Sequence, residues 1–357
     1  ELAKEIKCRN LMIAVKEKEM KEGHSNLIKM IILTLENVVN ERMGNIFNMT
    51  FEETIEEKEQ NDLSSNYKYS LLISHMIIYL QRIFDIESFK ENFIHITNNI
   101  FKSILLPLLI ITKSELEQCV NPNKFIEVQI DAEDIIHQNK NKTIKSSVAL
   151  FIKSIFSNSI SKDNFIVNYS LEMLIHSLHI NDITTNIVLP NDKVSQLLIN
   201  DDFKKIDLSL LVLCIIGDCQ IESTNQDIQI TFEKIQSLLF SKELPVYIKH
   251  KVLLFIRQYV LIFYSPEMEQ FLVIIQYLFE SMLQNEYLLI SKEASDILNE
   301  LLNEYENFRK NSMSSVISHF MPMLIETIKT SRVMTVFDVL LEIEMKYENS
   351  QQNKEIF

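Results

Sequence analysis

Apolar positions recur with helical spacing along most of the chain, and the clearest case lies in its last fifty residues. Between Met313 and Ile328, apolar residues follow the i, i+3, i+4, i+7 rule, while Ser, Glu and Lys residues take the other positions. This spacing places the apolar side chains on one side of an α-helix. The segment therefore predicts an amphipathic helix that buries one face against a neighbour.

Comparable patterns occur along the rest of the chain. They begin near Lys4, Asn26, Tyr67, Ser88, Lys142, Asn164, Asp192, Lys204, Gln226, Leu244, Pro266, Leu288 and Arg332. They amount to roughly fifteen helices, and a strand-like alternation of apolar and polar residues is nowhere sustained. The alternating strands and helices that Rossmann or barrel enzymes require are absent from the pattern. The chain is therefore predicted to be all-α.

One predicted helix differs from the others in its composition. The segment from Leu71 to Phe84 is apolar on most of its circumference. A helix that is apolar all round is typical of a protein interior. We therefore expect this helix to be buried on several sides and to belong to an inner layer.

The last third of the chain shows a repeat. Amphipathic helical patterns close with Tyr259, Tyr305 and Tyr347, at intervals of 46 and 42 residues. These intervals match the helix-pair period of HEAT repeats, in which each pair buries its apolar stripe against the next pair. The fold class expected is an α-solenoid superhelix of HEAT-type antiparallel helix pairs.

We expect this solenoid to form one domain over residues 1–357, with about seven helix pairs. Two stretches interrupt the pattern, Gly44 to Asn66 and Ser114 to Asn141, and both are predicted to be inserted loops. The chain begins at Glu1 without Met or a signal-like apolar stretch, so we expect it to be a fragment of a longer protein.

Composition narrows the range of functions. The chain has only three glycines, Gly23, Gly44 and Gly217, so the glycine-rich phosphate loops and the nucleophile elbow of hydrolases have no counterpart. We expect neither enzyme activity nor a cofactor. The formal net charge of −14 favours basic protein partners over nucleic acid or anionic lipid. No apolar run is long enough to predict membrane insertion, and the four cysteines lack the spacing of a disulfide framework.

The first interruption contains an acidic cluster. Its members are Glu52, Glu53, Glu56, Glu57 and Glu59. Such a cluster can attract a segment rich in Lys and Arg, and we take it as the candidate cargo-binding site. A solvated loop with no specific contact is the simpler alternative.

Two further sets have spacings that call for comparison with metal sites. Glu172, His176 and His179 lie at i, i+4 and i+7 of one predicted helix. A fourth ligand is not evident, so partly buried histidines are the simpler interpretation, and no metal is expected. Cys214 and Cys219 are five residues apart on an apolar helix, so their thiols point in different directions and do not suit one metal ion. We interpret them as buried, inert thiols.

The passage from Leu105 to Ile155 is the most specific in the chain. A helix with the step Leu106-Pro107-Leu108 is followed by acidic residues, then by Asn121-Pro122-Asn123-Lys124-Phe125-Ile126. An acidic spacer and the helix TIKSSVALFIKSI come next. This order of elements resembles a segment of importin-beta superfamily karyopherins. Later, KKIDLSLLVLCIIGD and ELPVYIKHKVLLFIRQY resemble two helices of the same family, so the likeness extends roughly from Asn92 to Tyr347.

The likeness is greatest to the importin-seven/eight branch and to the exportin that recycles importin-alpha. It implies a nuclear transport receptor that shuttles between cytoplasm and nucleus. The implied partners are the Ran GTPase, basic cargo proteins and phenylalanine-glycine nucleoporins, and the chain would form middle and later repeats. The alternative is a structural HEAT-repeat scaffold in a stable complex, without transport activity.

Overall fold

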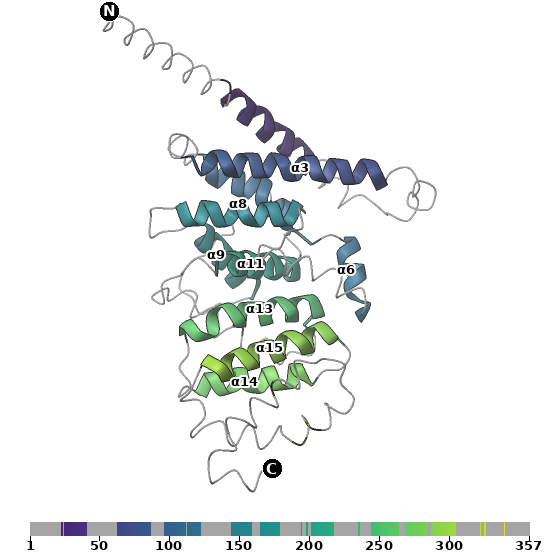
Figure 1. The fold of residues 1–357 in the computed structure, drawn as a ribbon, viewed down its shortest axis with the longest axis vertical. Coiled ribbons are helices and arrows are strands. Elements are labelled where there is room, and N and C mark those ends of the chain that lie inside the picture. The colour runs from purple at the N-terminus through teal and green to yellow at the C-terminus, as the bar shows by residue number, and fades with distance from the viewer. Residues whose placement is uncertain are drawn as a thin grey trace, which may run out of the picture. The chain divides into compact units, whose positions relative to one another are not determined.

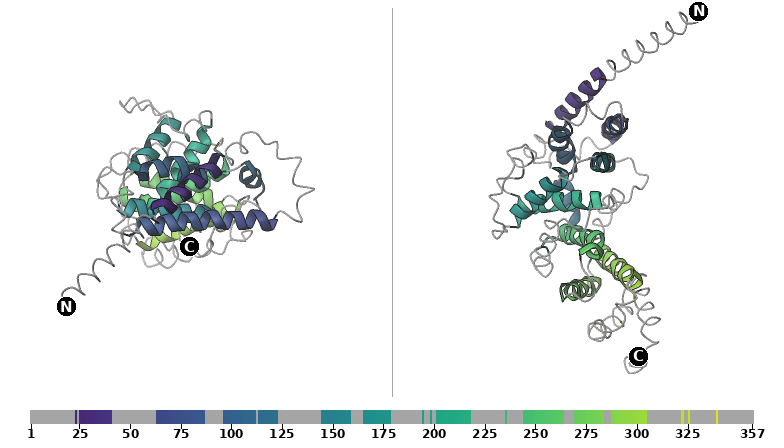
Figure 2. Two further views of the ribbon diagram at one scale, coloured as in Figure 1. Left: turned by 90° about the horizontal axis from the view of Figure 1, so that it is seen from above. Right: turned by 90° about the vertical axis from the view of Figure 1, so that its left-hand side faces the viewer.

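The structure is a computed structural model, and it describes about half of the chain. The described residues are 23, 25–40, 63–86, 96–111, 113–122, 144–158, 165–178, 194, 198, 201–217, 235, 244–263, 269–283, 287–304, 322, 325 and 339. All regular secondary structure among these residues is helical, and they include no strand (Figures 1 and 2). The all-α class predicted from the sequence is confirmed for this part of the chain.

The chain divides into two compact units. The first comprises Glu1–Leu109, Lys142–Ile155 and Asp192–Val194, and the second comprises Ile110–Asn141, Phe156–Asn191 and Ser195–Phe357. Each unit has its own buried apolar core. Among the described residues, the helices are too short or too polar for any of them to span a lipid bilayer.

The first unit contains a helix over residues 25–40, α3 (Leu63–Phe84), the π-helical turn η2 (Phe101–Leu105), α5 (Leu106–Leu109) and most of α8 (Ile144–Asn158). The end of α3 packs on α8, where the rings of Phe84 and Phe151 meet edge to face with centroids 6.0 Å apart. Beside them the Ser154 hydroxyl donates a hydrogen bond to Asp85. An apolar and a polar contact thus join the same two helices.

A proline accounts for the π-helical turn. The ring of Pro107 would clash with the carbonyl group four residues earlier in a regular α-helix, and proline has no N–H group to donate. In η2 the N–H group of Leu106 donates to the carbonyl oxygen of Phe101, five residues back. This wider turn accommodates Pro107 within a buried helix, as π-turns do elsewhere.

The expectation that residues 71–84 are buried on several sides is wrong. In α3, Ile77, Leu80 and Phe84 are buried, but Leu72 on the same helix is 50% exposed. Only one side of α3 is covered. The apolar side chains on its other side remain at the surface, as many apolar side chains of folded proteins do. A helix buried all round does exist, but it is α11.

The second unit contains α6 (Lys113–Cys119), α9 (Phe165–Ser177), α11 (Asp202–Gly217), α13 (Val246–Phe263), α14 (Glu269–Met282) and α15 (Leu288–Glu304). Helix α11 packs against α9 and α13, and α13 packs in turn against α15, which also contacts α14 (Figure 1). We call α11, α13 and α15 the helix row. Their first residues lie 44 and 42 residues apart.

Local signals define where the helices of the row begin. The carboxylate of Asp201 accepts a hydrogen bond of 3.1 Å from the N–H group of Lys204, as an N-cap residue does. The carbonyl group of Pro245 accepts bonds of 3.0 Å from the N–H groups of Ile248 and Lys249 at the start of α13. The Asp201 cap and the first backbone bonds of α13 stabilise these starts, and the observed starts of α11 and α13 lie within two residues of the predicted ones.

Helices α11 and α13 approach each other closely. Every residue of α11 from Lys205 to Ile216 is buried. At its end, a Cβ atom added to Gly217 would lie 3.1 Å from Oε1 and 3.2 Å from Cβ of Gln258 in α13. Glycine at this position therefore lets the two helices pack tightly. The short helix α6 also contacts α13, and it occupies the first part of the predicted loop between Ser114 and Asn141.

The different surroundings of α11 and α3 lead to a prediction about stability. Leu208→Ala removes a side chain that is 0% exposed, and we expect the free energy of unfolding to fall by about 3 kcal/mol because a cavity remains. Leu72→Ala is the matched control and should cost less than about 1 kcal/mol. Urea denaturation followed by circular dichroism measures both. Equal losses for the two variants would contradict the assigned burial.

Candidate functional site

Helix α13 carries two long side chains that reach the two other helices of the row. Arg257 and Tyr259 are two residues apart, which corresponds to about 200° around an α-helix. They therefore project to opposite sides. Tyr259 bonds to α11 and Arg257 bonds to α15, so the middle helix is tied to both of its neighbours.

Tyr259 contacts α11 through a buried hydrogen bond. The Tyr259 hydroxyl donates to the carbonyl oxygen of Leu213 at 2.7 Å, across 46 residues of sequence. The side chain of Tyr259 is 0% exposed, and its ring lies 4.7 Å from that of Phe255. A tyrosine in this position combines a large apolar contact with a bonded hydroxyl group.

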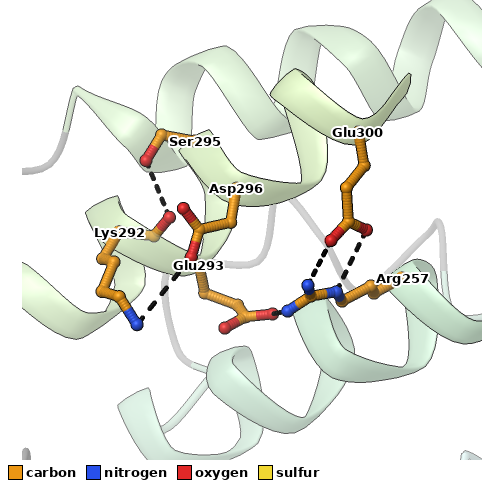
Figure 3. Close-up of polar contacts among 6 residues, drawn as sticks. All are labelled: Arg257, Lys292, Glu293, Ser295, Asp296 and Glu300. Carbon is orange, nitrogen blue, oxygen red and sulfur yellow. Dashed lines mark hydrogen bonds and ion pairs between the residues drawn. The ribbon is translucent and has the colours of Figure 1, made fainter. Parts of the chain in front are cut away.

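The contact with α15 is a three-residue ion-pair cluster. Nη1 of Arg257 lies 3.1 Å from Oε1 of Glu293, and Nε donates at 3.1 Å to Oε2 of Glu300. Nη2 also pairs with Oε1 of Glu300, so the guanidinium group binds that carboxylate with two nitrogens (Figure 3). Glu293 and Glu300 are seven residues apart, which is about two helical turns, so they lie on one side of α15.

The three groups differ in their access to water. The side chain of Glu293 is 2% exposed, that of Arg257 is 26% exposed and that of Glu300 is 48% exposed. Burial by itself would lower the pKa of Arg257, but the adjacent carboxylates of Glu293 and Glu300 outweigh it, so its pKa is raised above the ordinary value. Arg257 is therefore positively charged at every physiological pH and neutralises a buried carboxylate.

A second ion pair lies on the same helix. Nζ of Lys292 is 3.8 Å from Oδ2 of Asp296, one turn further along α15, and the Ser295 hydroxyl donates to the carbonyl oxygen of Lys292 at 2.7 Å (Figure 3). Arg257 and Lys292 thus face three carboxylates, so this group of side chains carries a net negative charge. A guanidinium group held between carboxylates bridges α13 and α15, which is a structural role.

Another group of polar side chains surrounds Tyr247 at the start of α13. Burial raises the pKa of the Tyr247 phenol well above its ordinary value, and the nearby Asp207, Asp201 and Cys119 raise it further. Asp207 belongs to α11 and Cys119 to α6, and both are buried. Tyr247 is therefore a neutral hydroxyl group at the meeting point of α6, α11 and α13.

The structure describes part of the residues that the sequence singled out. The acidic cluster of Glu52, Glu53, Glu56, Glu57 and Glu59 lies outside the described residues, as do His179, Cys219, Tyr305 and Tyr347. Glu172 and His176 are half-buried on α9. Within the described part of the chain, no group of three His, Cys, Asp or Glu residues is placed to hold a metal ion. Cys214 is buried, as predicted.

The Arg257 cluster was missed at the level of sequence. A usable signal was present, because an arginine inside VLLFIRQYVLIF can be buried only beside an acidic partner, and Glu293 and Glu300 have the spacing of one helix face.

Comparisons with known proteins return no match. No protein-family model, no curated protein and no solved structure is similar to this chain. Interpretation of its function therefore depends on the residues and on their packing.

The ion-pair cluster predicts unequal effects for its members. Arg257→Gln should lower the free energy of unfolding by about 3 kcal/mol, because it leaves the carboxylate of Glu293 buried without its guanidinium partner. Glu300→Gln should cost less than about 1 kcal/mol, since that carboxylate is exposed and screened. The double variant Arg257→Gln/Glu293→Gln should recover part of the loss. Urea denaturation of the parent protein, the single variants Arg257→Gln and Glu293→Gln and the double variant forms the cycle, and purely additive losses would contradict the pairing.

We predict that the protein loses stability at alkaline pH because the phenol of Tyr277 is buried. Burial raises the pKa of Tyr277, on α14, to about 12, whereas an unfolded chain has a tyrosine pKa of about 10. The folded state holds this proton more tightly than the unfolded state does. The protonated phenol therefore contributes on the order of 2 kcal/mol to the free energy of unfolding below pH ~10, and this contribution is lost as the pH rises towards ~12.

Ultraviolet absorbance of phenolate, followed during an alkaline titration of the folded protein, measures this. Tyr277→Phe should remove one late-titrating phenol and leave the others. Loss of a phenol that titrates near the ordinary value would contradict the assignment.

Proposed function

We propose that the chain is a HEAT-type α-solenoid segment of an importin-beta-like nuclear transport receptor, and that it binds basic protein cargo under control of the Ran GTPase. The packing of the helix row supports this proposal. Its helices begin at intervals of 44 and 42 residues, which fits one helix pair per repeat. Contacts between α13 and α15, with α14 packed on α15, fit the stacking of one pair on the next.

The hydrogen bond between Tyr259 and Leu213 is the observation that carries the proposal furthest. Its two residues are 46 residues apart, the same interval that separates Tyr259 from Tyr305 in the sequence repeat. The prediction that a helix closes at Tyr259 is wrong, because α13 continues to Phe263. The bond from Tyr259 to the preceding helix of the row nevertheless supports a period of one helix pair. Repeats held in this way present long surfaces that suit protein recognition.

Charge supports the choice of partner. The net charge of −14 and the excess of carboxylates around Arg257 attract lysine-rich and arginine-rich segments and repel nucleic acid. The resemblance of the Leu105–Ile155 passage to karyopherins supports a transport role within this class, with phenylalanine-glycine nucleoporins as further partners. The shuttling between cytoplasm and nucleus belongs to the same proposal.

Binding to two probes tests the proposal with the full chain. We expect retention of Ran locked in its GTP form, and salt-sensitive binding of a fluorescent lysine-rich nuclear localisation peptide. Changing all five glutamates of the candidate cargo site, Glu52, Glu53, Glu56, Glu57 and Glu59, to Gln should weaken peptide binding about tenfold. Fluorescence anisotropy measures the peptide and a pull-down measures Ran.

The matched control changes five glutamates on helices to Gln and thus alters the net charge equally. These are Glu36, Glu115, Glu117, Glu172 and Glu280. Equal weakening by both sets would contradict a local cargo site. Absence of Ran binding at micromolar concentration would contradict the transport role and would favour the structural scaffold instead.

A further inference from the structure

We propose that the helix row contains one hinge, located between α13 and the α14–α15 pair, and that the ion-pair cluster of Arg257 closes it. The joint between α11 and α13 stays fixed when this hinge opens. The inference concerns the protein alone and does not depend on any partner. Its basis is the difference in chemistry between two joints made by the same helix.

Buried groups hold the joint between α11 and α13. Tyr259 is 0% exposed and bonds to a backbone carbonyl at 2.7 Å, and α11 is buried on all sides. A Cβ atom added to Gly217 would lie 3.1 Å from Oε1 of Gln258, so a larger residue there would require the Gln258 side chain to shift. Separation of these helices would expose apolar surface on both, and dissolved salt does not weaken that kind of contact.

Charged groups add to the apolar packing of the joint between α13 and α15, where Ile290 and Ile297 of α15 are also buried. Two of the three charged groups can be reached by water. Arg257 is 26% exposed and Glu300 is 48% exposed, so dissolved ions screen their attraction. When α15 tilts away, Glu293, Arg257 and Glu300 all gain hydration, which offsets much of the lost attraction. Of the two joints, this is therefore the one that dissolved salt weakens.

The same charges oppose a different movement. If α15 slid along α13 without separating, the carboxylate of Glu293 would stay buried but lose its guanidinium partner. A buried carboxylate without its partner is destabilising by several kcal/mol. The cluster thus permits tilting and opposes sliding, so the two helices return to one register each time the joint closes.

Helix α14 is expected to move together with α15. The two helices pack on each other, and the buried hydroxyl of Ser291, in α15, donates to the carbonyl oxygen of Met282, at the end of α14, at 2.5 Å. Near the start of α15 the Tyr287 hydroxyl reaches the carbonyl oxygen of Val120, beyond the end of α6, at 3.4 Å. Helix α6 packs on α13, so this end of α15 remains tethered while the end that carries Glu300 opens.

Hydrogen–deuterium exchange of the full chain, followed by mass spectrometry, tests the hinge. A helix that loses packing on one side unfolds locally more often, so its amides exchange faster. Between about 50 mM and about 1 M NaCl, which shortens the screening length about fourfold, amides of α14 and α15 should exchange about fivefold faster. Amides of α11 should not change.

Two variants of equal net charge sharpen the test. Arg257→Met/Glu293→Met replaces the bridge between the helices with apolar side chains, and it should abolish the salt response of α14 and α15. Lys292→Met/Asp296→Met removes an ion pair within α15, and it should leave that response intact. Circular dichroism verifies that both variants fold.

Three results would overturn the inference. They are an equal salt response in α11 and α15, no response in the parent protein, and loss of the response in the Lys292/Asp296 variant. If the Arg257/Glu293 variant does not fold, Glu300→Gln in low salt should reproduce the faster exchange of α15, and its failure to do so would also overturn the inference. None of these measurements includes Ran or a peptide, so their outcome is separate from that of the binding experiments.

Discussion

The arrangement of the second unit depends on the opposed directions of Arg257 and Tyr259 along α13. Positions i and i+2 of an α-helix differ by about 200° around the axis, so two long polar side chains at this spacing reach opposite neighbours. Each finds a partner of the appropriate chemistry, a backbone carbonyl in α11 and two carboxylates in α15. A middle helix that is bonded on both sides holds three successive helices in register.

The two neighbours of α13 differ because their sequences differ. Helix α11 has a continuous apolar stretch from Leu208 to Ile216, with polar residues confined to small hydroxyl and thiol groups. Helix α15 alternates apolar positions with Lys292, Glu293, Asp296 and Glu300. The first composition requires burial on all sides, whereas the second leaves one side for charges and water. The α11–α13 joint is therefore buried, whereas the α13–α15 joint combines buried residues with two charged groups that water reaches.

Helix positions could be predicted from the sequence with some accuracy, because they depend on local signals. The pattern placed the start of α15 at Leu288, where it is, and the starts of α11 and α13 within two residues. Burial around each helix depends on neighbours that are distant in sequence. The apolar count alone therefore predicted an inner helix at residues 71–84, although Leu72 lies at the surface and α11 is the enclosed helix.

The candidate site was harder to predict, for a related reason. The predicted repeat spacing drew attention to Tyr259, and its bond to Leu213 spans 46 residues, the interval between Tyr259 and Tyr305. The role of Arg257 could not be predicted in the same way, because its partners lie 36 and 43 residues further along and belong to another helix. A pairing of this kind requires knowledge of which faces of two helices meet, and the periodicity of each helix alone does not contain it.

Arginine suits this position for a geometric reason. Glu293 and Glu300 lie about two turns apart on α15, roughly 10 Å along the helix axis. A group that bonds to both carboxylates must therefore offer donors in more than one direction. The guanidinium group offers nitrogens on several edges, and in Arg257 Nη1 binds Glu293 while Nε and Nη2 bind Glu300. A lysine would supply the charge and three N–H donors, but all from one nitrogen, so it could not bind one carboxylate with two nitrogens and the other with a third. The planar guanidinium group thus binds both carboxylates at once and links α13 to α15. Because it is partly exposed to water, this link is sensitive to the surrounding ions.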